Sequence, residues 1–343
     1  MEHNDPMHEH IRSFADMWEE GWRIAAASNA YGGLSAPKNM LLCGMGGSSI
    51  GGALLESLAF SSSEIPLALC RGYDIPAWAG SDTLVVCTSY SGNTEETLSA
   101  FEQAGRRGCS RFCITSGGEL TRRAGEEGVP FVAIPGGLPP RAALPYTFVP
   151  LLHLASVLGV VTITAVDKEE TLAALRELAA AYGDATPNEA TIVADYLTGR
   201  IPVVYSGPGL LAAANLRWRG QIQENAKTPA FGNLYPELNH NEIEGWESRY
   251  DILSNIAVIE LATKEDPPAV RRRMDVTRRL LEPKAAGWYR FEPRGESPLT
   301  RLLSTVALGD WVSYYLAKNL DVDPMPVALI DALKEALSRT TVG

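Results

Sequence analysis

Short apolar runs alternate with stretches of helical periodicity along most of the chain. Runs of this length, bounded by glycine, proline or small polar residues, are typical of buried parallel strands, and the periodic stretches between them predict crossover helices. In the first half the predicted strands are Asn39–Cys43, Pro66–Cys70, Thr83–Thr88, Arg111–Thr115 and Pro130–Ile134. An apolar helix from Pro145 to Leu158 follows them and is expected to cover the sheet.

The second half repeats this alternation. It opens on an amphipathic helix that carries Leu172, Leu175 and Tyr182 on one side. The remaining predicted elements are the strands Ile201–Tyr205, Ile252–Leu261 and Trp288–Phe291 and the helices Arg271–Arg279, Pro298–Lys318 and Met325–Leu337. The pattern therefore predicts an α/β fold of two doubly wound domains, residues 1–160 and 161–343, each a parallel sheet flanked by helices, with loops that meet in one cleft.

Charge and hydropathy narrow the class of protein. The chain has 343 residues and a formal net charge of −11, which opposes binding to nucleic acid or to anionic lipid. No apolar run reaches the roughly 20 residues that a membrane span needs, and the N-terminus is polar rather than signal-like. We therefore expect a cytoplasmic protein with neither nucleic acid nor membrane as a partner.

The metal-ligating residue types form no convincing metal site. The five cysteines lack the paired spacing of a zinc site, and we expect them to be reduced and buried. His240 and Glu242 have the spacing of the zinc deaminase H-x-E motif, but its cysteine partners are missing. His3, His8 and His10 lie in an N-terminus that we expect to be frayed. The sequence thus predicts no metal site and no cofactor.

A glycine-rich turn, Gly44–Gly52, joins the first predicted strand to a helix. Backbone N–H groups at a helix N-terminus bind anions, so Gly46, Gly47 and Ser48 are candidate phosphate-binding residues. A dinucleotide fingerprint is disfavoured because Ser49 stands where its last glycine is needed. A simple packing turn, in which glycine only permits close approach, remains the alternative.

A second turn, Ser89–Thr97, follows another predicted strand and again opens a helix. Ser89, Ser91 and Thr94 place three hydroxyl groups near free N–H groups, and Asn93 with Glu96 has the spacing of a capping box. The lysine of a triphosphate-binding loop is absent, which favours a single phosphate monoester. The alternative is that the hydroxyl groups only cap the helix.

These two turns resemble the sugar isomerase (SIS) domain, whose phosphate-binding signature the stretch Ser89–Thr97 closely matches. Four further stretches resemble the bifunctional phosphoglucose/phosphomannose isomerase family. They are Pro139–Tyr146, Gln223–Lys227, Glu237–Trp246 and Asp323–Lys334. Because the stretches occur in family order over nearly the whole chain, the resemblance is far more specific than a single SIS turn.

The resemblance implies an enzyme that interconverts glucose 6-phosphate and mannose 6-phosphate with fructose 6-phosphate through an enediol. In that family Glu224 corresponds to the base that moves the proton between C1 and C2, and His240 to the histidine that opens the sugar ring. Arg141 corresponds to a cation that stabilises the enediolate, and Lys334 to a lysine near the ring oxygen. The resemblance also implies a homodimer in which His240 enters the active site of the partner chain.

Other interpretations remain open. Each of the four residues could be structural or exposed, as most glutamates, histidines, arginines and lysines are. At the level of function, the alternatives are another SIS sugar-phosphate isomerase and a non-catalytic SIS sugar-phosphate sensor. A sensor is disfavoured because the sequence shows no DNA-reading helix pair and no basic surface. Turnover of fructose 6-phosphate distinguishes an enzyme from a sensor.

Overall fold

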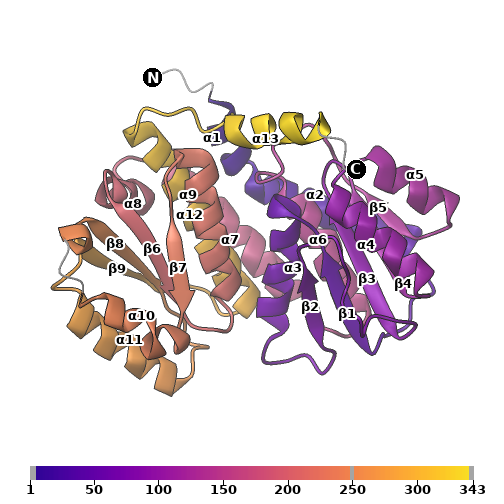
Figure 1. Cartoon of the computed structure of the whole chain (residues 1–343), viewed down its shortest axis with the longest axis horizontal. Helices are drawn as coiled ribbons and strands as arrows, with labels where there is room; N and C mark the ends of the chain where they lie inside the picture. Colours follow the sequence, from indigo (N-terminus) through magenta and orange to yellow (C-terminus); the bar gives the residue numbers. More distant parts are fainter. Residues whose placement is uncertain (1–4, 248–250, 340–343) are drawn as a thin grey trace.

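The fold consists of two parallel sheets that lie side by side, each with helices on both faces (Figure 1). It is known from a computed structural model that describes residues 5–247 and 251–339. The strands of the first sheet are β1 (Asn39–Cys43), β2 (Leu67–Cys70), β3 (Thr83–Ser89), β4 (Ser110–Thr115) and β5 (Phe131–Ala133). Those of the second are β6 (Ile201–Ser206), β7 (Phe231–Leu234), β8 (Ile256–Leu261) and β9 (Gly287–Phe291). The α/β fold class predicted from the sequence is confirmed.

The helices connect these strands and cover their faces. In the first half they are α1 (Pro6–Arg12), α2 (Phe14–Ala27), α3 (Gly46–Ala59), α4 (Glu95–Arg106), α5 (Gly118–Glu126) and α6 (Leu144–Val157). In the second half they are α7 (Ala165–Gly183), α8 (Glu189–Leu197), α9 (Ala212–Ala226), α10 (Glu242–Gly245), α11 (Pro268–Leu281), α12 (Pro298–Asn319) and α13 (Ala328–Ser338).

The first sheet has the strand order β2-β1-β3-β4-β5, and alternate residues of each strand enter different cores. Met40 and Leu42 of β1 pack on the side covered by α3 and α6, whereas Leu41 and Cys43 pack on the side covered by α4 and α5. Both faces of the sheet are therefore buried, which explains why its strands are continuous apolar runs.

The second sheet has the strand order β7-β6-β8-β9. One face packs against α9 and α12, and the other packs against α11 through residues such as Met274. Because α3 contacts both α9 and α12, a single apolar core continues from one half to the other. The predicted domain boundary at residues 160/161 falls between α6 and α7 and stays a prediction, since the core is continuous across it.

Two strands of the second sheet differ from the sequence-based predictions. The strand predicted at Ile252–Leu261 begins only at Ile256, because Asp251–Asn255 forms a 3-10 turn. Strand β7 was not predicted, since its four residues include only two large apolar side chains. Its Gly232 is required by tertiary packing: a Cβ there would lie 2.3 Å from the carbonyl oxygen of Val204 on β6.

The N-terminal segment is ordered from Asp5, whose side chain caps α1. His8 is 5% exposed and packs edge-on against Trp311, so the expectation of a frayed segment at His8 and His10 is wrong. His3 lies outside the described residues. All five cysteines are buried free thiols, as predicted.

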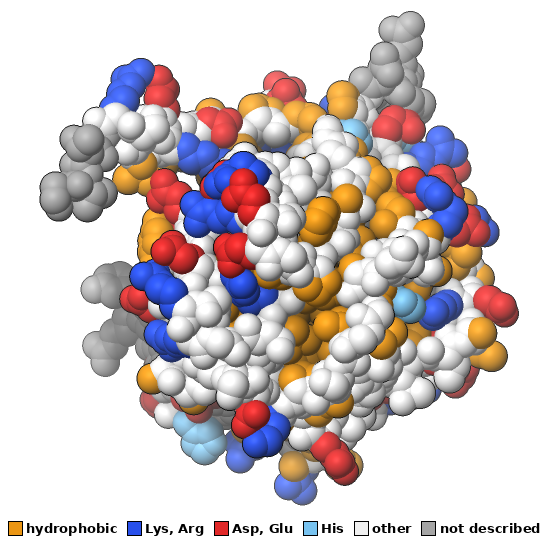
Figure 2. Space-filling view, turned by 90° about the vertical axis from the view of Figure 1, so that its right-hand side faces the viewer, with side chains coloured by type: hydrophobic (Ala, Val, Ile, Leu, Met, Phe, Trp, Pro, Cys, Tyr) orange, Lys and Arg blue, Asp and Glu red, His pale blue; other side chains and the backbone are white. Residues whose placement is uncertain are grey.

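The described helices include none that is both long and apolar enough to cross a bilayer. On the face shown in Figure 2, basic and acidic side chains are interspersed around an apolar central area. On α5, for example, Arg122 pairs with both Glu119 and Glu126. Exposed pairs of this kind add little stability, and they leave that face without a continuous basic surface.

Candidate active site

The first glycine turn lies between the end of β1 at Cys43 and the start of α3 at Gly46. Its glycines are required by packing: a Cβ on Gly44 would lie 2.9 Å from the carbonyl oxygen of Thr88. A Cβ on Gly47 would lie 2.8 Å from the carbonyl oxygen of Pro140. The glycines thus permit close packing, and at Gly47 this packing brings the Arg141 segment to the N-terminus of α3, whereas phosphate binding at this turn stays a prediction.

The two predicted phosphate turns are joined by Ser48. This side chain is 7% exposed, and its Oγ accepts a hydrogen bond from the Tyr90 N–H at 3.0 Å. The hydroxyl proton of Ser48 is left to donate to another acceptor. The contact holds the start of α3 beside the loop that follows β3, so both turns lie at the same edge of the first sheet.

The second turn is held by its own hydroxyl groups. Ser89 Oγ lies 2.9 Å from Thr94 Oγ1 and accepts the Gly92 N–H at 3.1 Å, while exposed Ser91 accepts the Asn93 N–H at 3.3 Å. The predicted capping box is wrong: Thr94 is the N-cap of α4, and Asn93 Oδ1 instead accepts the Glu119 N–H of α5. The first turn of α4 therefore keeps N–H groups that no side chain caps, as an anion site requires.

Arg141 connects three parts of the chain that are distant in sequence. Its guanidinium donates to Asn225 Oδ1 at 2.7 Å and to the carbonyl oxygens of Pro324 and Met325 at 2.5 and 2.9 Å. It also lies 3.6 Å from Glu224 Oε2. Arg141 is 4% exposed, and this burial lowers its pKa from the usual value. Its neighbours are mostly neutral carbonyl and amide oxygens. A guanidinium stays charged in such a site, so Arg141 supplies a fixed positive charge.

Glu224 lies in the last turn of α9 with a side chain that is 31% exposed. Lys227 ends this helix in the left-handed region at φ 53° and donates from Nζ to the Glu224 carbonyl oxygen at 2.5 Å. Burial and the nearby Arg141 lower the pKa of Lys227. The Glu224 carboxylate is thus partly open to solvent and lies beside the buried Arg141 guanidinium.

A cavity of about 190 Å³ joins these groups. Its walls include Gly46, Gly47, Arg141 and Glu224, so it connects the N-terminus of α3 to the proposed base and cation. Sequence analysis missed other wall residues, among them the cation Arg71, which directly follows β2. Its position was the available signal, because β2 neighbours β1 and parallel strands end at a common edge.

The structure does not bring His240 to this cavity. Helix α9, strand β7 and the 3-10 turn Glu237–His240 follow one another, and β7 runs parallel to β6. In a right-handed crossover the helix ends at the amino edge of the sheet, so Glu224 and the exposed His240 lie at opposite edges of the second sheet.

Lys334 lies on the exposed helix α13, which no described residue covers. Figure 1 shows α13 along the same side of the molecule as the end of α9. Its approach is fixed by Arg141, which holds the segment just before it at Pro324 and Met325. Lys334 is thus on the same side of the molecule as Glu224, whereas His240 is not.

Metal-ligating side chains are not clustered here. In the described ranges, 5–247 and 251–339, no group of three or more histidine, cysteine, aspartate or glutamate residues is arranged to hold a metal ion. His240 is near Glu242 in sequence, but Glu242 is used elsewhere: its carboxylate accepts hydrogen bonds from Tyr205 and Asn233.

Known proteins match this chain over most of its length. The bacterial phospho-glucose isomerase C-terminal SIS domain matches residues 186–337. The bifunctional phosphoglucose/phosphomannose isomerase of Caldicellulosiruptor bescii is 41% identical over 302 residues, 87% of this chain and 89% of that protein. The one from Aquifex aeolicus is 38% identical over 307 residues, 89% and 92% of the two chains. The solved C-terminal domain of glucosamine-fructose-6-phosphate aminotransferase from Francisella tularensis shares the fold, with a TM-score of 0.72 at 12% identity over 95% of this chain and 99% of that one.

Proposed function

Because the chain belongs to the bifunctional phosphoglucose/phosphomannose isomerase family, we propose that it interconverts glucose 6-phosphate and mannose 6-phosphate with fructose 6-phosphate. The observation that carries this function is the meeting of Arg141 and Glu224 at a cavity that also reaches Gly46 and Gly47. One site thus supplies an anion-binding helix terminus, a fixed cation and a carboxylate. An aldose–ketose isomerisation of a phosphorylated sugar needs these three groups.

The substrate phosphate binds at the second turn, where Ser89, Ser91 and Thr94 surround the start of α4. Hydroxyl and backbone N–H groups at a helix N-terminus stabilise a phosphate monoester through charge-assisted hydrogen bonds. Ser48, which contacts the Tyr90 N–H, and the glycines of the first turn complete the site. The sugar then extends from the phosphate toward Arg141 and Glu224.

Proton transfer is the work of Glu224. Its carboxylate removes the proton from C2 of the aldose, or from C1 of the ketose, and returns it to the neighbouring carbon of the enediol. Negative charge develops on the O1 and O2 oxygens during this step, and the fixed Arg141 guanidinium stabilises it. One enediol is common to all three sugar phosphates, so a pocket that allows rotation about C2–C3 accounts for both activities.

Ring opening needs a proton donor and acceptor, and His240 of the partner chain supplies it in a homodimer. Support for this arrangement comes from topology, because Glu224 and His240 lie at opposite edges of the second sheet of one chain. Helix α13 supports it as well, since Leu329, Leu333 and Leu337 are 88%, 59% and 61% exposed. Burial of this apolar side against a second copy would place Lys334 at the shared site.

We further propose a cytoplasmic enzyme of glycolysis and gluconeogenesis. The five reduced thiols are consistent with a reducing compartment, and phosphorylated hexoses are intermediates of these routes. The proton donors, the base and the cation in this mechanism are all side chains of the homodimer. The enzyme should therefore work without an added metal ion.

The deciding experiment is to incubate metal-stripped protein with fructose 6-phosphate and to identify the aldose products. The proposal predicts both glucose 6-phosphate and mannose 6-phosphate, with activity unchanged by EDTA. Binding of fructose 6-phosphate without turnover would show a sensor instead. Loss of activity on chelation, restored by Zn²⁺, would refute the side-chain mechanism. Glucose 6-phosphate alone at equilibrium would refute the dual specificity.

A further inference from the structure

A second cavity, of about 400 Å³, lies at the carboxyl edge of the second sheet. Its walls are the turn after β6, the segment Glu265–Pro267 after β8, the start of α12 and the end of α3. The two sheets share the order of their central strands, so β6 and β8 correspond to β1 and β3. This cavity therefore occupies the position in the second half that the candidate active site occupies in the first, although the described lining residues of the two do not overlap.

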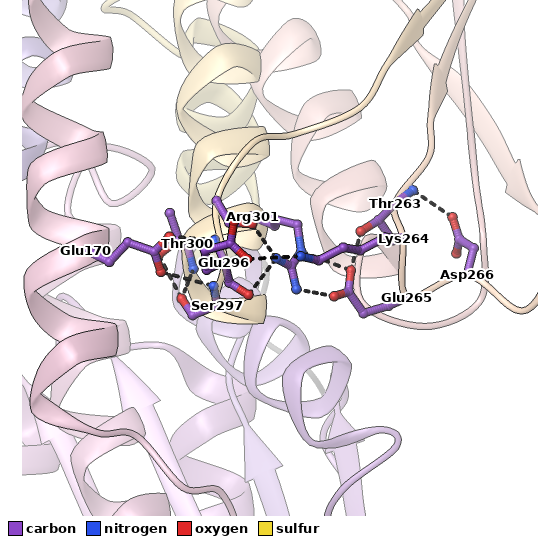
Figure 3. Close-up of polar contacts among 10 residues, drawn as sticks. Glu170, Thr263, Lys264, Glu265, Asp266, Glu296, Ser297, Thr300 and Arg301 are labelled. Atoms are coloured by element: carbon purple, nitrogen blue, oxygen red, sulfur yellow. Dashed lines mark hydrogen bonds and ion pairs between the residues drawn. The ribbon is translucent and has the colours of Figure 1, made fainter.

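One helix terminus at this second cavity, the start of α12, is already occupied by a carboxylate of the chain. Glu170 accepts the N–H groups of Glu296 and Ser297 at 2.5 and 3.0 Å and the Thr300 hydroxyl at 3.0 Å (Figure 3). Ser297 Oγ accepts the N–H of Thr300 at 3.1 Å. The donors that would hold a phosphate at the start of α12 are therefore satisfied within the fold.

The nearest buried cation is also neutralised. Arg301 forms a two-point ion pair with Glu265 and donates to the carbonyl oxygens of Gly295 and Glu296 (Figure 3). The charged residues in the described wall of the cavity are Asp167, Glu265 and Asp266, all acidic. An anionic ligand would be repelled by these walls, in contrast to the cavity that contains Arg71 and Arg141.

Asp266 is a buried acidic wall residue that forms no ion pair with any described side chain. It is 4% exposed, and its Oδ2 accepts the Thr263 N–H at 2.8 Å. Oδ1 accepts no hydrogen bond from any described residue, and in Figure 3 only one Asp266 oxygen carries a dashed line. Oδ1 lies against Gly207, where a Cβ would be only 2.0 Å from it. Burial raises the pKa of Asp266 to about 6, because the opposing effects of the Thr263 N–H and of the Arg271 charge are smaller than the cost of desolvation.

We propose that this cavity is a second binding site, for a small organic cation whose ammonium group pairs with Oδ1 of Asp266. The remaining wall suits a hexosamine-sized molecule, because it combines the Ser61 and Ser62 hydroxyl groups with the apolar side chains of Leu58, Leu210 and Leu299. The ligand class is the opposite of the anionic substrate of the first cavity. The inference does not depend on the proposed isomerase activity, because no wall residue of this cavity borders the candidate active site.

The test is calorimetric titration of the intact protein with glucosamine, the probe that combines an ammonium group with hydroxyl groups. N-acetylglucosamine has nearly the same shape without the charge, and putrescine has the charge without the ring. Glucosamine should bind at least tenfold more tightly than N-acetylglucosamine, and Asp266→Asn should weaken its binding at least tenfold. Asparagine still accepts the Thr263 N–H, so this variant is expected to fold.

Asp16→Asn, which changes an exposed acid of α2, is the matched control and should leave glucosamine binding unchanged. Binding of putrescine alone among the three probes, lost in Asp266→Asn, would still support a cation site. Equal binding of N-acetylglucosamine, undiminished binding to Asp266→Asn or no binding of either cation would overturn the proposal. Isomerase activity measured on the same samples keeps the two proposals separate, since Asp266 lies outside the candidate active site.

Discussion

The carboxyl edges of the two sheets have the same topology but opposite charge. At the first edge the start of α4 has no side-chain cap, and Arg71 and Arg141 border the cavity beside α3. At the second edge Glu170 occupies the start of α12, and Arg301 is paired with Glu265. A parallel sheet delivers helix N-termini to its carboxyl edge in both halves, but the side chains decide whether such an edge accepts an anion.

Backbone and side chains have different roles at the two edges. Glycines allow close approach in both halves, at Gly47 against Pro140 and at Gly207 against Asp266. In the first half the close approach brings an arginine to the helix terminus, whereas in the second it brings a carboxylate. The same close approach of backbone therefore places a positive charge in one half and a negative charge in the other.

The largest effect is expected when the proposed base, Glu224, is removed. Glu224→Gln should keep substrate binding but lower the rate by about 10²–10⁴-fold or more, because an amide cannot accept the C2 proton. Exchange of solvent deuterium into C1 or C2 measures the step directly. Glu126→Gln, at an exposed helix end paired with Arg122, is the control and should exchange normally. Near-normal exchange in Glu224→Gln would assign the base to another residue.

Phosphate recognition should depend on hydroxyl groups of the first edge only. Ser89→Ala and Thr94→Ala should each raise KM for fructose 6-phosphate by about 10- to 100-fold, since a hydrogen bond to a charged group contributes about 1.5–3 kcal/mol. Thr263→Ala alters the corresponding loop of the second half and should leave KM unchanged. An unchanged KM in both first-edge variants would show that the second turn does not bind the substrate phosphate.

Subunit mixing tests whether the opposite edges of the second sheet serve different active sites. Glu224→Gln and His240→Ala chains should each be inactive alone. In a heterodimer one site carries both substitutions and the other is intact, so random pairing should restore about a quarter of wild-type activity in a closed two-fold dimer. Mixtures that demonstrably exchange subunits and stay inactive would show that both residues act within one chain.

The smallest expected effect concerns Asp266 and stability. Burial raises its folded pKa to about 6, above the ordinary aspartate value of 3.8, with Arg271, Glu265 and Glu292 as the charged neighbours. The folded state therefore binds more protons between these values, and stability should fall as pH rises from about 4 to about 6 and stay lower above that. Asp266→Asn should remove this dependence and raise the unfolding free energy at pH 8 by about 2 kcal/mol. Urea unfolding at pH 4 and pH 8 measures both, and an unchanged pH profile would contradict the raised pKa.

Sequence analysis identified most of the first edge because its information is local. The stretch Ser89–Thr97 contains its strand end, its hydroxyl groups and its helix start within nine residues, and the structure keeps them together. The prediction of the capping box failed for the opposite reason, because Asn93 bonds to Glu119 on another helix. Family membership was likewise predictable, since the matching stretches follow one another along the chain, and it is confirmed by the relatives.

Apolar periodicity and short motifs act over a few residues, so the alternating strands and helices, the two strand-to-helix turns and the family could be predicted from the amino-acid sequence. Only the tertiary structure decided that Arg141 binds the Pro324 carbonyl 183 residues away and that Gly232 must pack on β6. It also decided that Glu170 occupies the start of α12, 127 residues further along the chain at Ser297. Side-chain charge is visible in a sequence, but the partner that neutralises it is selected by packing between distant elements, so the contrast between the two edges appears only after folding.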